Sequence, residues 1–331
     1  MAATVLFCTD TFWDDRGDEI VAIDPTVEVI RLVGQEHITP SDLERITVAY
    51  FSPDTWPARA ANFMGTCVRA NNLKWLQTFS AGTDSPIFIS LRDRGVTVTN
   101  SAGASAKSIA QSVLMYLLAL SRDLPRLARS QSNHRWEPHS STDLSSVRLG
   151  IVGLGAIGSE VARLASAFEI ETIGLRRTVS GNEVCETWTN DRLDDLLGWA
   201  DAIVVTAPLT DDTRGMFNAA TFAQMRPGAW FINVGRGEIV DEPALIESLV
   251  DGHLGGAGLD VFAIEPLPPD SPLWVLPNVI ITPHSSGTTD VSRRRQVDMF
   301  VENFRRHASG KPLENVTVGD VSAHSTESSQ G

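Results

Sequence analysis

A glycine-rich segment in the middle of the chain has the spacing of a phosphate-binding loop. The strand-like run RLGIVG leads into Gly153, Gly155 and Gly158, spaced as G-x-G-x-x-G, and a helical pattern begins at Ala156. The first glycine permits a tight turn, the second lets the backbone approach a pyrophosphate, and the third lets the helix pack closely on the strand. Amides at the start of the helix, at Ala156 and Ile157, would face the phosphates. The segment therefore predicts a dinucleotide site.

The following strand-like run, ETIGLR, ends where such domains carry an acid that reads the ribose, about 20 residues beyond the glycines. This chain has Arg176, Arg177 and Thr178 there instead. An acid would bond the 2′-hydroxyl and repel a 2′-phosphate, whereas guanidinium groups bind phosphate bidentately. The position predicts a preference for NADP(H), with NAD(H) possible. Alternatively both arginines are solvated surface residues; Asp195 and Asp201, the other nearby acids, fall beyond the strand end.

Three residues suited to 2-keto acid chemistry follow predicted strands in the second half of the chain. Arg236 follows FINVG, Glu265 follows GLDVFAI, and His284 ends IITPH; open α/β sheets bind ligands at the carboxyl ends of their strands. A planar guanidinium suits a carboxylate and a keto oxygen, and His donates protons near neutral pH. A carboxylate beside the His would orient its ring and favour its protonated form. Singly each has a plain structural explanation; together they predict reduction of a 2-keto acid.

Strand-like and helical runs alternate through both halves of the chain, which predicts α/β architecture with parallel sheets. In the first hundred residues the strand candidates are 4–8, 27–33, 46–52, 73–80 and 96–100, with helical pattern over 41–45 and 58–69. In the second half the strand candidates are 148–153, 171–176, 202–207, 229–234, 255–261 and 279–284, with helices over 156–168, 193–199, 219–225, 242–251 and 288–308.

A long helix is predicted from Ala104 through residue 124. It is apolar almost all round, so we expect it to be buried between domains or between subunits. The polar stretch 129–146 reads as a connecting loop.

Composition narrows the classes of function. The net charge of −14, from 27 basic and 41 acidic residues, argues against a nucleic-acid partner, which requires a concentrated basic face. No uninterrupted apolar stretch reaches the roughly 20 residues of a membrane span. Cys8, Cys67 and Cys185 form no metal-type pair, so we expect reduced thiols and no metal site. The N-terminal run reads as a strand rather than a signal peptide, which makes a cytoplasmic location the expectation.

Several segments together resemble the D-isomer-specific 2-hydroxyacid dehydrogenase family over nearly the whole chain: GLGAIG, APLTDDTRGMFN, MRPGAWFINVGRGEIVDEPAL, GGAGLDVFAIEPLPPDSPLW and NVIITPHSSG. The resemblance implies that Arg236 binds the substrate carboxylate and keto oxygen, and that Glu265 and His284 form a proton relay. It also implies that Asp260 lies by the nicotinamide. The segment TFSAGTDSP resembles the loop that holds the substrate carboxylate, at Ala81 and Gly82. Further implied cofactor contacts are Thr206, Ala207 and Pro208, which lie over the adenosine half, and Val234.

The implied fold consists of two similar doubly wound parallel-sheet domains, a Rossmann-type nucleotide domain inserted into a flavodoxin-like catalytic domain. We expect the catalytic domain over 1–102, the dinucleotide-binding domain over 103–284, a return to the catalytic domain over 285–318 and a disordered tail over 319–331. EPLPPDSPLW and the two arginines are similar to the glyoxylate/hydroxypyruvate reductase branch. That branch implies small 2-keto acid substrates, D-2-hydroxy acid products and a homodimer.

Two segments depart from the family pattern. Residues 109–112 read IAQS where many relatives carry an acid and a His, and 285–290 read SSGTTD where a small apolar run is commoner. We expect the second departure to change the polarity near the substrate. Trp136 either reaches a partner's active site or packs locally. The same fold also serves a dinucleotide-sensing corepressor, and phosphite oxidation is a further alternative. Formate dehydrogenase is disfavoured because a Gln replaces the relay acid there, whereas Glu265 is present.

Overall fold

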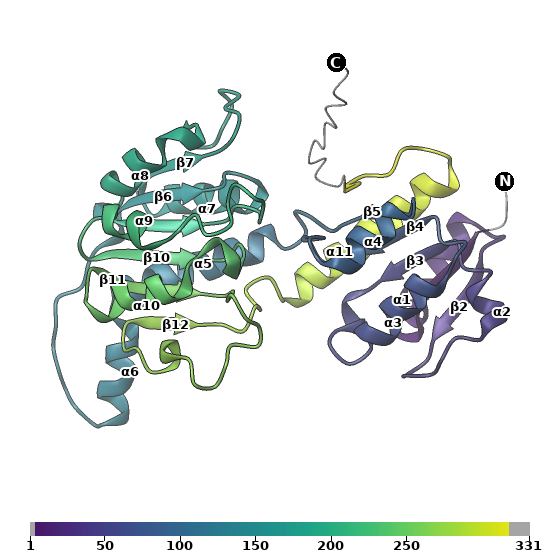
Figure 1. The fold of residues 1–331 in the computed structure, drawn as a ribbon, viewed down its shortest axis with the longest axis horizontal. Helices are drawn as coiled ribbons and strands as arrows, with labels where there is room; N and C mark the ends of the chain where they lie inside the picture. The colour runs from purple at the N-terminus through teal and green to yellow at the C-terminus, as the bar shows by residue number, and fades with distance from the viewer. Residues whose placement is uncertain (1–3, 318–331) are drawn as a thin grey trace, which may run out of the picture. The chain divides into compact units, whose positions relative to one another are not determined.

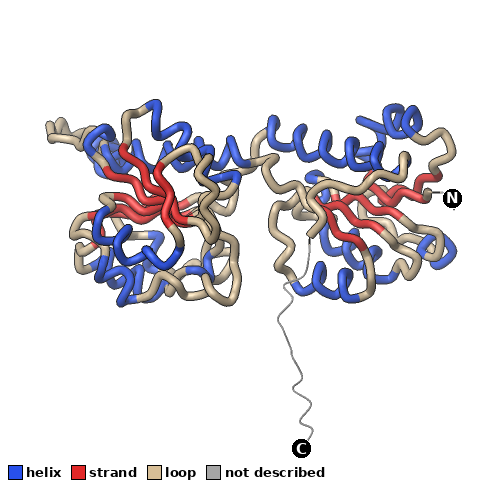
Figure 2. The backbone as a smooth tube through the Cα atoms, turned by 90° about the horizontal axis from the view of Figure 1, so that it is seen from above, coloured by secondary structure: helices blue, strands red, loops and turns tan. Residues whose placement is uncertain are grey.

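The chain folds into two compact α/β units in a computed structural model that describes residues 4–317. The larger unit runs from Ser105 to Ser292, and the smaller unit combines the residues up to Ala104 with those from Arg293 onward. By these contacts, 285–292 groups with the larger unit, although the sequence assigned it to the catalytic domain. The predicted tail over 319–331 lies outside the described residues. Each unit has helices on both faces of a parallel sheet (Figure 1), and Figure 2 shows the layers from above.

The smaller unit contains a five-stranded parallel sheet in the order β2-β1-β3-β4-β5, the doubly wound flavodoxin-like order. Its strand β1, VLFCT, lies between β2 and β3 and is buried along its whole length, as expected for a strand covered by helices on both faces. The strands are β1 (Val5–Thr9), β2 (Glu28–Leu32), β3 (Val48–Phe51), β4 (Trp75–Thr78) and β5 (Thr97–Thr99). The helices in the N-terminal part of this unit are α1 (Asp10–Ile23), α2 (Pro40–Leu43), α3 (Ala60–Arg69) and α4 (Pro86–Asp93).

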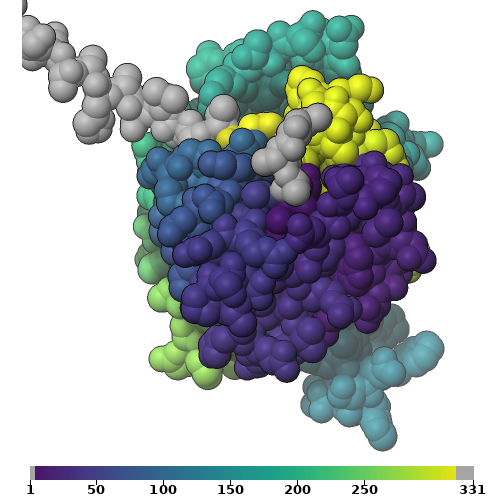
Figure 3. Space-filling model, turned by 90° about the vertical axis from the view of Figure 1, so that its right-hand side faces the viewer, coloured from purple at the N-terminus to yellow at the C-terminus, as the bar shows by residue number. Residues whose placement is uncertain are grey.

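A helix from the end of the chain completes the core of the smaller unit. In α11 (Asp290–Ala308), Phe300 stacks on Tyr50 with ring centroids 4.0 Å apart and meets the edge of Phe12 at 5.4 Å. Figure 3 shows this helix, in yellow, against the purple N-terminal residues. Residues of α11 therefore form part of the core of the smaller unit.

The larger unit contains a seven-stranded parallel sheet in the order β12-β11-β10-β9-β6-β7-β8. Because the order reverses direction between β6 and β9, the switch point at which such sheets bind ligands lies at the carboxyl ends of these two strands. These two sheets confirm the predicted fold class. The strands are β6 (Arg148–Val152), β7 (Glu171–Leu175), β8 (Glu186–Trp188), β9 (Ala202–Val205), β10 (Ala229–Asn233), β11 (Leu254–Leu259) and β12 (Val279–Ile281).

The long apolar helix α5 (Ala106–Ser121) packs within the core of the larger unit rather than only against neighbours outside it. Val113, Leu117 and other apolar residues of α5 join the buried cluster of β6 and α7. The remaining helices of this unit are α6 (Leu124–Ser132), α7 (Ala156–Ala167), α8 (Leu193–Trp199), α9 (Ala219–Gln224) and α10 (Glu242–Val250).

The sequence did not predict α1, α4, α6 or β8. Helix α1 carries many charges and buries only Phe12, Gly17 and Ile20, so its apolar period is weak. Helix α6 extends into residues 129–132, for which the sequence predicts a loop. Its polar sequence buries only Ser130, so it carries little apolar periodicity.

The three cysteines are unpaired; Cys8 and Cys67 are buried, and burial raises the pKa of both thiols. Within residues 4–317, the helices are all too short or too polar to cross a membrane.

Candidate active site

The three glycines of the loop between β6 and α7 differ in what surrounds them. Gly153 has φ 103°, and a Cβ there would lie 2.5 Å from the amide nitrogen of Ala207. A Cβ on Gly158 would lie 2.4 Å from the carbonyl oxygen of Gly153. A Cβ on Gly155, by contrast, would meet no atom within 4 Å. The fold therefore requires the first and third glycines, and the space at Gly155 is open to a ligand.

The start of α7 is also suited to an anion. Gly155 is the N-cap residue, and its helix receives no side-chain capping hydrogen bond. The amides of Ala156 and Ile157 have no hydrogen-bond partner in the described part of the chain. Unpaired amides and the helix dipole together favour a bound phosphate.

The loop after β9 lies directly against the glycine loop. The Thr206 hydroxyl donates to the Gly153 carbonyl, and the Thr206 amide donates to Val152 at 2.9 Å. The Pro208 carbonyl accepts from the Thr213 hydroxyl at 2.7 Å. Val234, which follows β10, is buried and donates its amide to Val205 at 3.1 Å. The structure thus places Thr206, Ala207, Pro208 and Val234 at the same edge of the sheet as the glycines.

The loop after β7 is closed by a carboxylate that sequence reasoning missed. Glu183 accepts hydrogen bonds from the Ser180 amide at 2.7 Å, the Ser180 hydroxyl at 2.8 Å and the Gly181 amide at 2.8 Å. These bonds, chiefly those from Ser180, lower the pKa of Glu183 to about 2. Arg176 pairs with the same carboxylate at 3.2 Å. Arg177 and Thr178 are exposed on this loop.

Arg236 follows β10 between two glycines that let neighbouring loops approach. A Cβ on Gly237 would lie 1.9 Å from the carbonyl carbon of Phe262, so only glycine fits against the loop after β11. The Arg236 Nη1 donates to the Gly235 carbonyl at 2.8 Å, and the Arg236 carbonyl accepts from Asn233 Nδ2 at 2.9 Å. The loop that carries Arg236 is therefore fixed against the loop that carries Glu265.

Glu265 and His284 form a direct pair. The distance from His284 Nδ1 to Glu265 Oε2 is 2.7 Å, and Glu265 Oε1 accepts the Phe262 amide at 3.1 Å. The side chains of Glu265 and His284 are 36% and 51% exposed, so the pair is open to solvent and to a reactant. Because Nδ1 faces the carboxylate, Nε2 is the ring atom left to exchange a proton.

Asp260 is almost fully buried behind this pair. Its carboxylate accepts the amides of Ser285 and Ser286, at 2.9 and 3.0 Å, and the hydroxyls of Thr282 and Ser286. Its contact with a nicotinamide therefore stays a prediction. The sequence does not single out Thr282, and it marks Ser286 only as a polar residue where a small apolar one is commoner.

Ala81 and Gly82 lie in the smaller unit, in the loop after β4. The Ala81 carbonyl accepts from Asn100 Nδ2 at 2.6 Å, and the Gly82 carbonyl accepts from the Ser80 hydroxyl at 2.9 Å. The amides of Ala81 and Gly82 have no partner among residues 4–317. The loop is oriented by its carbonyls, and its amides are available, as the predicted carboxylate contact requires.

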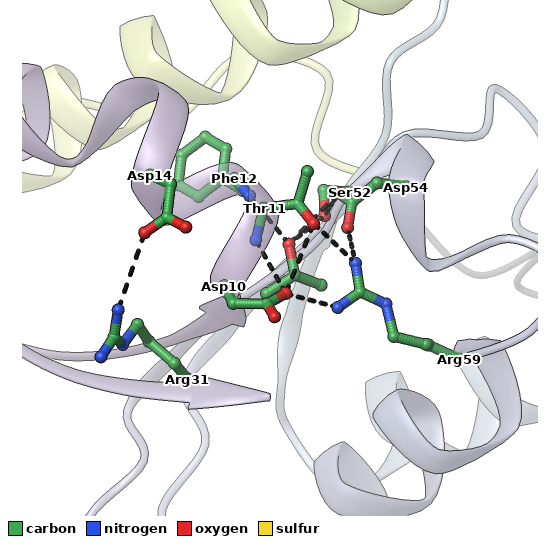
Figure 4. Close-up of polar contacts among 9 residues, drawn as sticks. Asp10, Thr11, Phe12, Asp14, Arg31, Ser52, Asp54 and Arg59 are labelled. Atoms are coloured by element: carbon green, nitrogen blue, oxygen red, sulfur yellow. Dashed lines mark hydrogen bonds and ion pairs between the residues drawn. The ribbon is translucent and has the colours of Figure 1, made fainter. Parts of the chain in front are cut away.

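An ion-pair cluster occupies the carboxyl ends of β1 and β3 in the smaller unit (Figure 4). The Arg59 guanidinium lies between the carboxylates of Asp10 and Asp54, and Ser52 donates to Asp54 at 2.6 Å. Partial burial opposes ionisation of Asp10, but hydrogen bonds from Arg59 and Thr11 outweigh it and lower the Asp10 pKa. These groups satisfy one another. No cluster of His, Cys, Asp and Glu that could hold a metal occurs in the described part of the molecule.

Comparison with known proteins gives consistent matches. A family model, D-isomer specific 2-hydroxyacid dehydrogenase, NAD binding domain, matches residues 114–286. The chain is 35% identical over 253 residues to a glyoxylate/hydroxypyruvate reductase B from Pectobacterium carotovorum, covering 74% of this chain and 79% of that protein. It is also 35% identical over 244 residues to a hydroxyphenylpyruvate reductase from Plectranthus scutellarioides, covering 73% and 77%.

Solved structures agree. A D-isomer specific 2-hydroxyacid dehydrogenase from Xanthobacter autotrophicus Py2 in complex with NADPH and MES is 32% identical with a TM-score of 0.78, covering 96% of this chain and 98% of that one. An NADPH-dependent glyoxylate/hydroxypyruvate reductase from Sinorhizobium meliloti in complex with NADP and sulfate is 31% identical with a TM-score of 0.76, covering 95% and 98%.

Proposed function

Because this chain belongs to the D-isomer specific 2-hydroxyacid dehydrogenase family, we propose that it reduces small 2-keto acids to D-2-hydroxy acids with NADPH. The observation that carries the proposal is the 2.7 Å contact between His284 Nδ1 and Glu265 Oε2. This pair lies at the carboxyl edge of the sheet that also carries the glycine loop and Arg236.

The residues of the larger unit fit a dinucleotide. The open space at Gly155, the left-handed turn at Gly153 and the uncapped start of α7 would hold the pyrophosphate. Thr206, Ala207 and Pro208 would lie along the adenosine half. When bound, the reduced nicotinamide supplies the hydride that adds to the keto carbon.

Residues of this chain bind the substrate and supply the proton that its keto oxygen gains. Arg236 holds the substrate carboxylate and keto oxygen with its planar guanidinium. His284 Nε2 donates the proton that the keto oxygen acquires as the hydride arrives at carbon. Glu265 orients the imidazole and favours its protonated form by opposite charge. Ala81 and Gly82 offer their amides to the substrate carboxylate.

The preference for NADPH rests on the loop after β7. Arg177 and Thr178 are exposed there, and Arg176 is oriented by Glu183. Cationic side chains therefore occupy the position at which an acid would select a ribose without a 2′-phosphate. The structures of relatives that contain NADPH or NADP support this preference.

The substrate is proposed from the relatives. Glyoxylate and hydroxypyruvate are the first candidates, since a named glyoxylate/hydroxypyruvate reductase is 35% identical. An equally similar relative is a hydroxyphenylpyruvate reductase, which makes an aromatic keto acid the second candidate.

A panel of keto acids tests the proposal. Purified protein is assayed for NADPH and NADH oxidation with glyoxylate, hydroxypyruvate and hydroxyphenylpyruvate, and NADPH binding is measured separately. We expect the highest kcat/KM with NADPH and one of the two small acids. Arg236→Ala should abolish turnover and keep NADPH binding, whereas Arg226→Ala, which breaks an ion pair with Asp201 elsewhere on the unit, should retain turnover. NADPH binding without oxidation by any acid would contradict the proposal.

We also propose that the chain forms a homodimer and acts in the cytoplasm. Large apolar side chains are exposed on and after α5 and α6: Met115, Leu124, Leu127 and Trp136, the last 94% exposed. Such side chains favour burial by a second copy. Light scattering coupled to size-exclusion chromatography tests this assembly, and a monomer at micromolar concentration would contradict it.

A further inference from the structure

We propose that a stripe of hydroxyl groups on α5, together with Thr282, Ser286 and Asp260, fixes the backbone of His284 and so positions its imidazole against Glu265. Tyr116, Thr282 and Ser286 are on this view positioning residues for the proton donor. The proposal rests on the proposed role of His284, and it names the part of the chain that holds that residue in place.

The backbone of His284 adopts a conformation that a side chain disfavours. Its φ is 49°, in the left-handed region. Such a conformation persists only where the surroundings hold it. Here the His284 amide donates to the carbonyls of both Asp260, at 2.8 Å, and Thr282, at 3.0 Å. The turn that presents the imidazole therefore depends on how firmly Asp260 and Thr282 are fixed.

The carboxylate of Asp260 accepts hydrogen bonds from residues on both sides of His284 in the sequence. Before it, the Thr282 hydroxyl donates to Asp260; after it, the Ser285 and Ser286 amides donate at 2.9 and 3.0 Å, and the Ser286 hydroxyl donates as well. Asp260 is 1% exposed, so its charge depends on these donors rather than on water. Three of these four donors bond to Oδ1 and the Ser286 hydroxyl bonds to Oδ2, so both oxygens of the carboxylate are held.

The hydrogen bond from Thr282 to Asp260 determines which hydroxyl is the donor in the neighbouring bond with Tyr116. Because Thr282 gives its one hydroxyl proton to Asp260, its oxygen accepts from the Tyr116 hydroxyl. Burial raises the pKa of Tyr116 to about 12, so this hydroxyl stays protonated. The Tyr116 ring is itself fixed, since a Cβ on Gly258 of β11 would lie 2.6 Å from its Cγ.

Two further hydroxyls on α5 bond to the same segment. The Ser112 hydroxyl donates to the Ser286 carbonyl at 3.1 Å, and Ser108 pairs with Thr289 at 3.0 Å. Ser108, Ser112 and Tyr116 are spaced four residues apart, so they share one face of the helix. The stripe includes Ser112 of IAQS, and its partners include residues of SSGTTD. The two departures from the family pattern therefore meet in one network.

Matched threonine substitutions test the proposal. Thr282→Val removes one hydroxyl of the network at nearly constant shape. Thr172→Val makes the same change on β7, where the hydroxyl donates to the Ile170 carbonyl at 3.1 Å. Ser286→Ala and Tyr116→Phe remove the neighbouring links and leave the backbone contacts in place. Each variant is measured for NADPH affinity, for kcat and KM, and for the ¹⁵N chemical shifts of the His284 ring, assigned by their absence in His284→Gln.

We expect Thr282→Val and Ser286→Ala to lower kcat by ~10- to 100-fold, the range of a misplaced reacting group, with KM and NADPH affinity within about twofold of wild type. The His284 ring signals should shift or split in both variants and stay unchanged in Thr172→Val. Unchanged ring signals and kcat in both network variants would overturn the proposal, as would equal changes in Thr172→Val. The ring signals are recorded without substrate, so they test the network even if the keto-acid panel fails.

Discussion

Oε2 of Glu265 lies 2.7 Å from Nδ1 of His284, while Oε1 of the same carboxylate is held by the amide of Phe262. Replacement by Gln keeps the shape and removes the charge that favours the imidazolium. We expect Glu265→Gln to lower kcat by ~100-fold and to move the active pH range downward, as measured by pH profiles of keto-acid reduction. Glu242→Gln is the matched control, because Glu242 accepts the amide of Ala263 at 3.3 Å in the neighbouring loop. A Glu265→Gln profile equal to that of Glu242→Gln would refute the relay.

Cofactor choice should depend more on Arg177 than on Arg176. Arg176 pairs with Glu183 at 3.2 Å, whereas Arg177 is exposed on the same loop. A hydrogen bond to a charged group contributes ~1.5–3 kcal/mol, so Arg177→Asp should lower the NADPH-to-NADH ratio of kcat/KM by more than tenfold. Arg176→Asp should shift the ratio in the same direction by less. Arg163→Asp, on the exposed face of α7, serves as the control; a ratio unaltered by both loop variants would remove the ribose argument.

Glu183 should organise its loop over the whole neutral range. Its pKa is about 2 in the folded chain, against an ordinary value of 4.5. Because the folded value is the lower one, the stabilising effect is complete above about pH 4.5 and is lost as the pH falls towards 2. Titration of Glu183 should therefore cause no change in NADPH affinity between pH 5 and pH 8, because the carboxylate stays ionised throughout that range. Glu183→Gln should weaken NADPH binding about tenfold by releasing amides that Gln cannot all accept; wild-type affinity in that variant would contradict this account.

Gly237 should be intolerant of even one methyl group. A Cβ there would lie 1.9 Å from the Phe262 carbonyl carbon, and the atoms that it would meet belong to the backbone of Phe262 and Ala263 rather than to a flexible side chain. Gly237→Ala should lower the free energy of unfolding by about 1–3 kcal/mol and displace the loop of Arg236. Gly198→Ala is the control, since a Cβ on that residue of α8 meets nothing within 4 Å, and it should be neutral or stabilising by up to about 1 kcal/mol. Urea unfolding measures both, and equal stabilities of the two variants would contradict the packing argument.

The stability of the chain should fall in mild acid through His307. Burial lowers the pKa of His307 below its usual 6.5, beside the Trp75 ring at 5.3 Å. Below pH 6.5 the unfolded chain therefore binds a proton at His307 more readily than the folded chain does. The free energy of unfolding is consequently highest above pH 6.5, as far as His307 is concerned, and declines below it. In urea unfolding between pH 5 and pH 8, His307→Gln should flatten this slope, and His134→Gln, at an exposed position, should leave it. An unchanged slope in His307→Gln would assign the acid sensitivity to other groups.

Much of the candidate site could be predicted because parallel strands place their carboxyl ends along one edge. Arg236 and His284 each follow a run of apolar residues that is recognisable as a buried strand, so their proximity follows from the order of strands. The glycine loop was predicted for a similar reason, since Gly153 and Gly158 have steric requirements that only glycine meets.

The hydroxyl network could not be predicted in this way. Asp260 follows β11, Thr282 and Ser286 follow β12, and Tyr116 lies on α5. Hydrogen bonds between such single side chains leave no periodic signal in a sequence. Similarly, the pairing of Arg176 with Glu183 depends on the path of an irregular loop. Helix α1 was missed because its charged residues hide a narrow buried face.

Gly155 separates the requirements of folding from those of ligand recognition. The empty surroundings of its Cβ position mean that an added methyl group would burden no contact of the protein itself. A chain with a larger residue only at position 155 should fold, assemble and resist denaturation like the wild type but should not bind dinucleotides. Such a chain would show which properties of the protein belong to its architecture and which are conferred by its coenzyme.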